Sequence, residues 1–306
     1  MAPLLESALP FPLWRRGKVR EVYQVSGARL LIVATDRVSA FDVVMHETVP
    51  DKGRVLTQLS AYWFRLLAPV AASHFITADT DDIIGALPSL AEHRDQIDGR
   101  AMLARRANPV AFECVVRGYL AGSAWAEYRR DGTLAGEAMP PELRESERFI
   151  PPLFSPATKV ESGHDANVPY SRMQRELGVP LANTLQERSL ALYTAGRDAA
   201  AQHGIIIADT KFEFGLDASG SPLLIDELLT PDSSRFWPAS GYAAGRSQPS
   251  FDKQPLRDWL AGERSAGRWD GNAPPPALPN DVVAATSARY REAFRRLVGR
   301  DLGPER

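Results

Sequence analysis

Charged and apolar side chains alternate along the stretch IIIADTKFEFG, residues 205–215. Asp209, Lys211 and Glu213 occupy odd positions, whereas the even positions carry no charge. Because successive side chains of a β-strand point to opposite faces, the pattern predicts a strand with one mostly apolar face and one face bearing two acids and a base. The charged face is therefore a candidate functional surface.

The apolar run LLIDELL, residues 223–229, follows a turn-rich stretch and predicts the second strand of a hairpin. If the hairpin closes through an even-length loop, Asp226 lies on the same face as Lys211 and Glu213, and Glu227 lies on the other. Opposed side chains on paired strands lie about 5 Å apart at Cβ, where two carboxylates repel unless a cation lies between them. The pair suits Mg²⁺, which takes phosphate oxygens as further ligands. An edge hairpin with a solvated face would give the same pattern, so the hairpin alone does not decide.

A second alternating segment, GKVREVY at residues 17–23, places Lys18 and Arg20 on one face beside a glycine. Two cations in this arrangement can hold a triphosphate, although a basic face on an exposed strand is the simpler alternative. The chain contains neither GxxxxGK[ST] nor GxGxxG, so a P-loop and a dinucleotide fold lack support. A nucleotide would have to be held in another way.

Two other segments place polar side chains where an element ends. TPDSSRFW supplies Asp232 and Arg235 directly after the second hairpin strand, and the fork of an arginine suits carboxylate or phosphate. VVRGYLAGS ends a strand with Arg117 and is expected to begin a helix at Ser123, where free backbone N–H groups favour an anion. Each pattern is also typical of a capped helix with a nearby arginine.

The segment from 139 to 170 is rich in proline and polar residues, and it is too long and irregular to serve only as a connection. Its stretch SPATKVESGHD contains Lys159, His164 and Asp165. Neither HExxH nor a Ser-His-Asp spacing is present, so a hydrolase is not indicated. The loop is expected to bind a ligand.

Helices and strands are mixed without a steady βαβ alternation, so the sequence predicts an α+β protein with two lobes. Asn108-Pro109 is a natural break, and we place the lobe boundary there, giving residues 1–108 and 109–306. The predicted elements are strands at 30–36, 102–107 and 112–122, the hairpin at 205–229, and helices at 55–67, at 124–130 with Ser123 as its cap, at 183–204 capped by Asn183, and at 281–299 capped by Asn280.

Composition limits the classes of function. The net charge of the 306 residues is −2, so no overall basic field indicates a nucleic-acid or anionic-membrane partner. Cys114 is the only cysteine, which excludes an intrachain disulfide and cysteine-rich zinc sites. The N-terminus lacks the features of a signal peptide, and no run reaches the roughly 20 apolar residues of a membrane span. A cytoplasmic location is expected.

Together these segments resemble the SAICAR synthetase family of purine biosynthesis. The resemblance is carried, in order along the chain, by GKVREVY, ATDRVSAFD, PDKGRVLTQLS, ECVVRGYLAGS, PATKVESGHD, IIADTKFEFG, IDELLTPDSSRFW and FDKQPLRDWL. It extends from about residue 13 to the terminal helix and is closest to the longer, yeast-like form, for which a monomer is expected. One departure is Ala111-Phe112, where the family usually has proline and an aliphatic residue; Pro109 is expected to serve as the hinge.

The resemblance implies an ATP-grasp-like fold with the nucleotide between two lobes. It implies an ATP-dependent ligase that joins L-aspartate to carboxyaminoimidazole ribotide (CAIR) through an acyl phosphate. A kinase-like phosphotransferase and a non-catalytic nucleotide-binding protein are the alternatives. Against the first, this sequence contains neither an HRD-type catalytic loop nor DFG. Against the second, a non-catalytic protein would have lost an acid or a cation, whereas Lys18, Glu213, Asp226 and Arg235 are all present. The implied residues are Lys18, Arg20, Lys159, Glu213 and Asp226 for ATP, Glu213 and Asp226 for Mg²⁺, Ser39, Arg117, Ser123, Asp232 and Arg235 for CAIR and aspartate, and Lys211, Asp36 and Lys159 for catalysis, with less definite roles for Lys52, His164 and Asp165.

Overall fold

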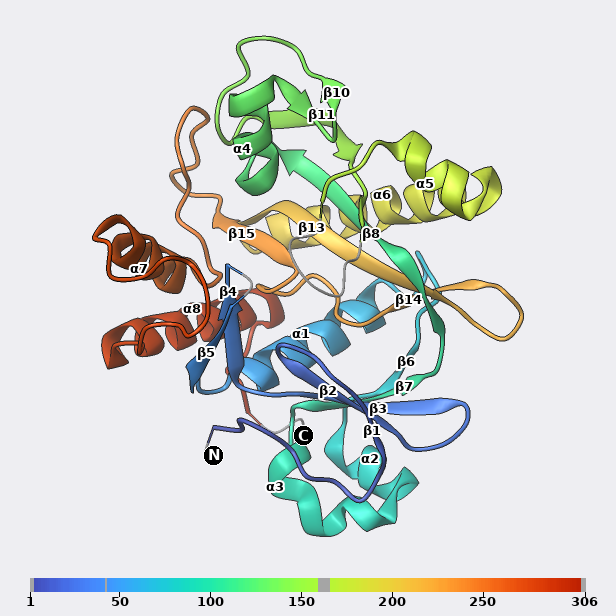
Figure 1. Cartoon of the computed structure of the whole chain (residues 1–306). Coiled ribbons are helices and arrows are strands. Elements are labelled where there is room, and N and C mark those ends of the chain that lie inside the picture. The colour runs from blue at the N-terminus through green and yellow to red at the C-terminus, as the bar shows by residue number, and fades with distance from the viewer. Residues whose placement is uncertain (1–2, 42, 159–165, 304–306) are drawn as a thin grey trace.

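A computed structural model describes residues 3–41, 43–158 and 166–303. Within them the chain forms two larger antiparallel sheets, one below and one above helix α1 (Lys52–Leu66) in Figure 1. Helices and strands are interspersed along the chain, which confirms the predicted α+β class. Lys159, His164 and Asp165 lie outside the described residues.

The N-terminal sheet has the strand order β1-β2-β3-β7-β6. Along β3, Leu31 and Val33 pack against α2 and α3, whereas Ile32 and Ala34 belong to the core that contains α1. Both faces of this strand are buried, which explains why its sequence is an unbroken apolar run. The elements are β1 (Leu13–Arg16), β2 (Arg20–Gln24), β3 (Arg29–Ala34), β6 (Phe75–Thr77), α2 (Thr80–Ala86), the 3₁₀ turn η1 (Pro88–His93), α3 (Arg94–Ile97) and β7 (Ala101–Arg105).

The C-terminal sheet has the order β11-β8-β13-β14, with β12 also paired to β8 and β15 to β13. Helix α6 covers one face, where its Leu185, Leu192 and Tyr193 share a core with Phe212 and Phe214 of β13. The other face carries the charged side chains. The elements are β8 (Asn108–Tyr119), α4 (Gly122–Asp131), β9 (Thr133–Leu134), β10 (Glu137–Ala138), β11 (Arg148–Phe154), β12 (Ala157–Thr158), α5 (Tyr170–Leu177), α6 (Val179–Ala201), β13 (Ile205–Leu216), β14 (Pro222–Ile225) and β15 (Ser234–Pro238).

A bulge interrupts the alternation of β13. The pairing of β13 with β15 shifts between Ile207 and Asp209. Ile207 therefore lies in the same core as Phe212, although simple alternation would place it on the face of Asp209. Beyond the bulge, Asp209, Lys211 and Glu213 share one face, as the sequence predicts.

The C-terminal helices lie beside a separate two-stranded ribbon, at the left of Figure 1. Helix α8 packs on α1, and α7 packs on α8. No helix in the described ranges is long and apolar enough to cross a membrane. These elements are β4 (Arg37–Ala40), β5 (Val43–Thr48), α7 (Gln254–Ser265) and α8 (Asn280–Val298).

Several predicted element ends are wrong. β8 begins at Asn108, so the strand runs through the predicted break at Asn108-Pro109. Helix α4 follows Ala121 without a side-chain cap, and Ser123 lies inside the helix. Helix α6 begins at 179, because Gly178 leads directly into it, and the Asn183 side chain accepts a hydrogen bond from Tyr170 instead. Helix α8 has Pro279 at its N-cap position, not Asn280.

The chain passes from the N-terminal sheet to the C-terminal sheet at residues 106–107, between β7 and β8. Their apolar sides are not separate, however: Ile32 and Met102 of the first sheet belong to the same buried cluster as Phe112 and Phe212 of the second. Helix α1 contributes to this cluster from between them. A division into lobes at 108/109 stays a prediction.

Candidate active site

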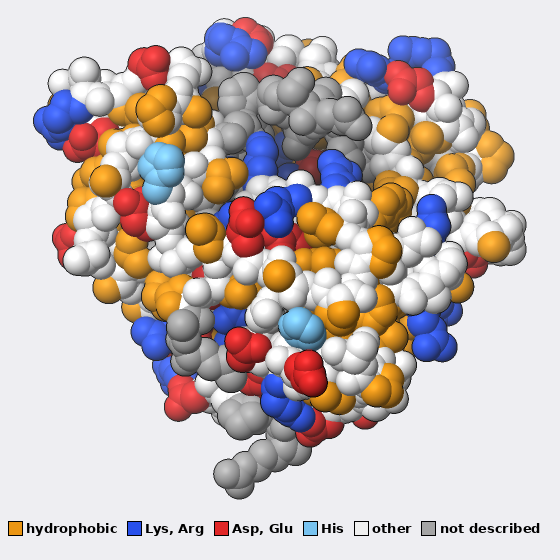
Figure 2. Space-filling view, turned by 60° about the horizontal axis from the view of Figure 1, so that its bottom comes forward, with side chains coloured by type: hydrophobic (Ala, Val, Ile, Leu, Met, Phe, Trp, Pro, Cys, Tyr) orange, Lys and Arg blue, Asp and Glu red, His pale blue; other side chains and the backbone are white. Residues whose placement is uncertain are grey.

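Charged side chains of three strands meet on the face of the C-terminal sheet that α6 does not cover. Asp209 lies opposite Arg117 of β8 and opposite Arg235 of β15 in the strand register. Its carboxylate is 3.6 Å from Nη1 of Arg117 and accepts a hydrogen bond from Nη1 of Arg235. Asp209 is thus a buried anion shared by two arginines. A space-filling view shows Lys and Arg side chains gathered around a hollow in the molecular surface (Figure 2).

Arg117 is oriented from a second side by Asn167, whose Oδ1 accepts from Nη2 at 2.9 Å. Burial lowers the pKa of Arg117, against the attraction of Asp209. Its Nε is buried and has no hydrogen-bond partner among the described residues. Asn167 is in turn bound by Glu127 of α4 at 3.0 Å. Arg117 therefore has a fixed position, and its Nε–H remains available to a ligand.

Arg235 lies against the N-terminus of α4. Gly122, with φ 57°, leaves no room for a side chain there, because a Cβ atom would be 2.0 Å from Nη2 of Arg235. Ser123 is the next residue of the helix, whose first turn has no side-chain cap. Uncapped N–H groups beside a guanidinium form an anion-binding arrangement. The structure thus brings together Arg117, Ser123 and Arg235, as the sequence predicts.

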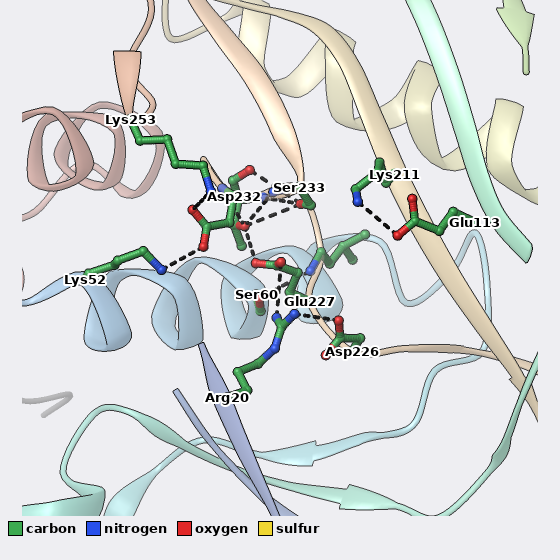
Figure 3. Close-up of polar contacts among 12 residues, drawn as sticks. Arg20, Lys52, Ser60, Glu113, Lys211, Asp226, Glu227, Asp232, Ser233 and Lys253 are labelled. Atoms are coloured by element: carbon green, nitrogen blue, oxygen red, sulfur yellow. Dashed lines mark hydrogen bonds and ion pairs between the residues drawn. The ribbon is translucent and has the colours of Figure 1, made fainter. Parts of the chain in front are cut away.

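Lys211 and Glu213 lie further along the same face of β13. Glu213 is directly opposite Glu113 of β8, and Nζ of Lys211 donates to Oε1 of Glu113 at 2.9 Å (Figure 3). Glu113 is a further candidate on this face, and its position in the sequence did not single it out. Its signal is the period of two, since it lies on the same strand face as Arg117.

The hairpin register differs from the prediction. Glu213 pairs with Ile225, so the loop has an odd length and simple alternation would turn Asp226 away from Glu213. Asp226 instead lies just beyond β14 with φ 67°, which changes the direction of the chain. Its carboxylate accepts from Nη2 of Arg20 at 2.6 Å, and Glu227, predicted on the far face, is 3.2 Å from Nη1 (Figure 3).

Arg20 is the cation around which these acids gather. Burial alone would lower the pKa of Arg20, but the carboxylates of Asp226, Glu227 and Glu213 outweigh it and raise the pKa. Asp226 thus contacts the guanidinium of Arg20, and Glu213, which lies opposite the neighbouring Ile225, attracts the same guanidinium, even though the register prediction is wrong. Glu227, expected on the far face of the hairpin, is a second acid that pairs with Arg20.

Asp232 lies at the other end of this charged group, in a buried cluster. Its Oδ2 accepts from Nζ of Lys52 at 2.7 Å, and its Oδ1 accepts from the Tyr290 hydroxyl at 2.5 Å, with Nζ of Lys253 at 3.5 Å. Burial would raise the pKa of Asp232, yet the two lysines and the tyrosine hold it well below its usual range. Burial lowers the pKa of Lys52. Asp232 is therefore ionised and fixed.

The structure also places three other predicted residues, Asp36, Ser39 and Lys18. Asp36 is fully buried in the N-terminal part, where its oxygens accept from the backbone of Leu4 and Gly53 and from Arg100 at 2.8 Å. These bonds fit a structural role and argue against a general base. Ser39 is half-buried on β4. Lys18 is exposed just before β2, next to Val19 and two residues from Arg20.

The acids near Arg20 would bind a divalent cation only if phosphate oxygens of a bound nucleotide completed its coordination. In the described part of the chain, no three His, Cys, Asp or Glu side chains are grouped closely enough to hold a metal ion. Glu213 nevertheless lies opposite Ile225, the residue before Asp226, and both carboxylates are hard oxygen donors that attract the guanidinium of Arg20. This donor set fits Mg²⁺, which keeps waters and takes phosphate oxygens.

Comparison with known proteins gives one consistent result. The family model described as SAICAR synthetase matches residues 13–274. A phosphoribosylaminoimidazole-succinocarboxamide synthase of Methylibium petroleiphilum is 52% identical over 298 residues, covering 96% of this chain and 98% of the relative. The enzyme of the same name from Cupriavidus taiwanensis is 47% identical, covering 95% of each.

Solved structures agree. A SAICAR synthase from Saccharomyces cerevisiae, solved in complex with SAICAR, is 40% identical with a TM-score of 0.88, covering 97% of this chain and 99% of the yeast chain. A SAICAR synthetase solved with ADP is 22% identical with a TM-score of 0.65, covering 94% and 98%, and supports the fold alone.

Proposed function

Because the chain belongs to the SAICAR synthetase family, we propose that the charged face of its C-terminal sheet, together with Arg20, forms the active site. The activity is the ATP-dependent ligation of L-aspartate to CAIR in purine biosynthesis, which yields the succinocarboxamide SAICAR, ADP and phosphate. The observation that carries the proposal is the pairing of Arg20 with Asp226 and Glu227 at one end of this charged group, with Arg117 and Arg235 paired to Asp209 at the other.

The end near Arg20 would hold the ATP phosphates. Arg20 is paired with Asp226 and Glu227, and a triphosphate offers its guanidinium an alternative anionic partner. Asp226 would then be released, with Glu213, to bind Mg²⁺. The bound ion would neutralise charge on the phosphates. Lys18, exposed just before β2, would cover the phosphates from outside, and Lys159 stays a prediction.

The other end would hold CAIR. A ribose phosphate carries two negative charges near neutral pH, and Arg117, Arg235 and the uncapped α4 N-terminus at Ser123 supply the matching donors. Asp232, ionised and held by Lys52, would accept from hydrogen-bond donors of CAIR. A role for Ser39 stays a prediction.

The reaction proceeds in two displacements. A carboxylate oxygen of CAIR attacks the γ-phosphorus, an O–P bond forms, and the bond to the β–γ bridging oxygen breaks, releasing ADP. The free amine of aspartate then attacks the acyl carbon, a C–N bond forms, the C–O bond to phosphate breaks, and the nitrogen loses a proton. Positioning and charge neutralisation supply most of the catalysis of the first displacement. Lys211, fixed by Glu113, would offset charge on the transferring group.

The test is ADP release measured with CAIR and aspartate added singly and together. The ligase releases ADP rapidly only with both, whereas a phosphotransferase acting on CAIR alone would not need aspartate. The matched variant is Glu213→Gln, which keeps the side-chain shape and removes the metal-binding charge. We expect a rate loss of at least about 100-fold with an unchanged circular dichroism spectrum. A near-normal rate would refute the metal assignment while leaving the family assignment intact.

A monomeric, cytoplasmic enzyme is the state we propose for the molecule. The support is the likeness to the longer form of the family, for which a monomer is expected, together with the reducing environment that suits a chain whose one cysteine is buried. Light scattering coupled to size-exclusion chromatography would give about twice the chain mass if the proposal is wrong.

A further inference from the structure

An asparagine and a glutamate extend the charged network beyond Arg117. Nη2 of Arg117 donates to Oδ1 of Asn167 at 2.9 Å, and Nδ2 of Asn167 donates to Oε2 of Glu127 at 3.0 Å. A guanidinium has only donors and a carboxylate has only acceptors, so an amide between them must turn its oxygen to one and its nitrogen to the other. Asn167 therefore connects an arginine of β8 to a glutamate of α4, and neither a purely donating nor a purely accepting side chain could do so.

The backbone holds Asn167 in place. Asn167 forms an antiparallel bridge with Ala157 of β12, and the N–H of Val168 donates to the carbonyl of Pro156 at 2.9 Å. Strand β12 in turn pairs with β8. The amide is thus tied, through β12, to the strand that carries Arg117.

Glu127 is held by its other oxygen as well. Oε1 accepts from the hydroxyl of Thr133 and from the N–H of Gly136, both at 3.0 Å. Burial would raise the pKa of Glu127, but hydrogen bonds, first that from the Gly136 N–H, outweigh burial and lower the pKa. Glu127 is therefore an ionised carboxylate with donors on both of its oxygens.

These contacts connect parts of the proposed phosphate site that lie on different elements. Arg117 and Arg235 lie on strands of the C-terminal sheet, whereas the uncapped N–H groups belong to the first turn of α4. Arg235 meets this turn at Gly122. From the other side, Glu127 and Asn167 join the same helix to Arg117. Helix α4 is thus held against both arginines.

We propose that Asn167 and Glu127 are positioning residues, which hold Arg117 and the N-terminus of α4 in the mutual arrangement that binds the phosphate of CAIR. The inference rests on the proposed function, because it takes Arg117 and α4 as the phosphate site. Neither Asn167 nor Glu127 touches substrate in this scheme. The buried Nε–H of Arg117, which has no partner among the described residues, is the donor that the arrangement leaves for the phosphate.

The sharpest test exchanges the two side-chain types. Asn167→Asp still accepts from Arg117, but it places a second carboxylate against Glu127. Glu127→Gln leaves one acceptor where the wild type has two. In the double variant the new amide can donate to the new carboxylate, while its oxygen still accepts from Thr133 and Gly136, so each contact of the network has a partner again.

ADP release measured against CAIR concentration, at saturating ATP and aspartate, gives the KM of each variant. We expect each single variant to raise the KM for CAIR about tenfold, the equivalent of one hydrogen bond to a charged group. The KM for ATP and kcat should change by less than about threefold, and the double variant should have a KM for CAIR within about threefold of wild type. Rescue of this kind is not expected if the two side chains only stabilise the fold.

Glu176→Gln on α5 is the matched control. It makes the same change as Glu127→Gln at a carboxylate that pairs with Arg172 and is 48% exposed, so the KM for CAIR should not change. A double variant as weak as Asn167→Asp would overturn the inference, because charge alone would then explain the effect. Wild-type KM values in both single variants would overturn it too. If Asn167→Asp does not fold, Glu127→Gln compared with the double variant decides the question.

Arg117→Lys separates the inference from the proposed function. It keeps a positive charge beside Asp209 and removes the planar fork. If it leaves the KM for CAIR unchanged, the proposed phosphate site is wrong. A rise in the KM for Arg117→Lys, without any rise for the variants of Asn167 and Glu127, refutes only the positioning roles.

Discussion

Replacing Asp209 by asparagine removes the charge that two arginines share and keeps the shape of the side chain. Arg117 is buried, with 4% of its side chain exposed, whereas 30% of the Arg235 side chain is exposed. Breaking a buried ion pair by removing one partner costs about 3–5 kcal/mol, and breaking an exposed pair costs about 1 kcal/mol or less. Asn167 still accepts from Arg117 in the variant. We therefore expect the free energy of unfolding to fall by about 3 kcal/mol, the low end of the buried range.

Urea denaturation with and without inorganic phosphate measures this effect and its cause. Phosphate can return negative charge to the two guanidinium groups, so it should stabilise Asp209→Asn more than wild type. The matched control is Asp198→Asn on α6, which breaks an ion pair with Arg197 while 61% of the Asp198 side chain is exposed. That change should cost less than about 0.5 kcal/mol and should not respond to phosphate.

The reasoning would be refuted in two ways. A loss of stability below about 1 kcal/mol would mean that Asp209 does not neutralise a buried charge. An equal effect of phosphate on Asp209→Asn and on wild type would mean that the two arginines do not form an anion site.

The cluster around Asp232 gives two further predictions. Tyr290→Phe removes the hydroxyl that donates to Asp232. We expect the free energy of unfolding, measured by urea denaturation, to fall by about 1 kcal/mol, and the KM for CAIR to rise with little change in kcat. An unchanged KM would argue against Asp232 as a CAIR contact. The folded state depresses the pKa of Asp232, so its charge stabilises the fold above the ordinary Asp pKa of about 3.9, and this contribution is lost as the pH falls below that value. Wild type should therefore lose stability more steeply than Asp232→Asn between about pH 4 and pH 2, and parallel curves would contradict the assignment.

Local patterns predicted much of the site because alternation is a property of a single strand. Asp209, Lys211 and Glu213 share a face as predicted, and Arg117 lies on the same face of the sheet, opposite Asp209 on the neighbouring strand. Arg235, which the resemblance assigns to CAIR, bonds to Asp209 on this face, and its role stays a prediction. Asp209, Lys211 and Glu213 are found from one segment and a period of two.

What the sequence could not predict depends on contacts between distant segments. Lys52 and Asp232 are 180 residues apart, and nothing local to either predicts their ion pair. The position of Asp226 depends on a single backbone angle, which alternation does not encode. The capping predictions at Ser123 and Asn183 were wrong because both residues lie inside helices that begin earlier, and the Asn183 side chain accepts a hydrogen bond from Tyr170. Tertiary contacts decide such cases.

The buried cluster that joins both sheets through α1 has a consequence for folding. Because Ile32 and Met102 pack in the same interior as Phe112 and Phe212, neither half has a complete interior of its own. The two halves should therefore melt as one cooperative unit, and a fragment ending at residue 108 should not fold in isolation. Substrate entry would then rely on movement of segments around the charged face, because separating the two sheets would expose their common interior to water.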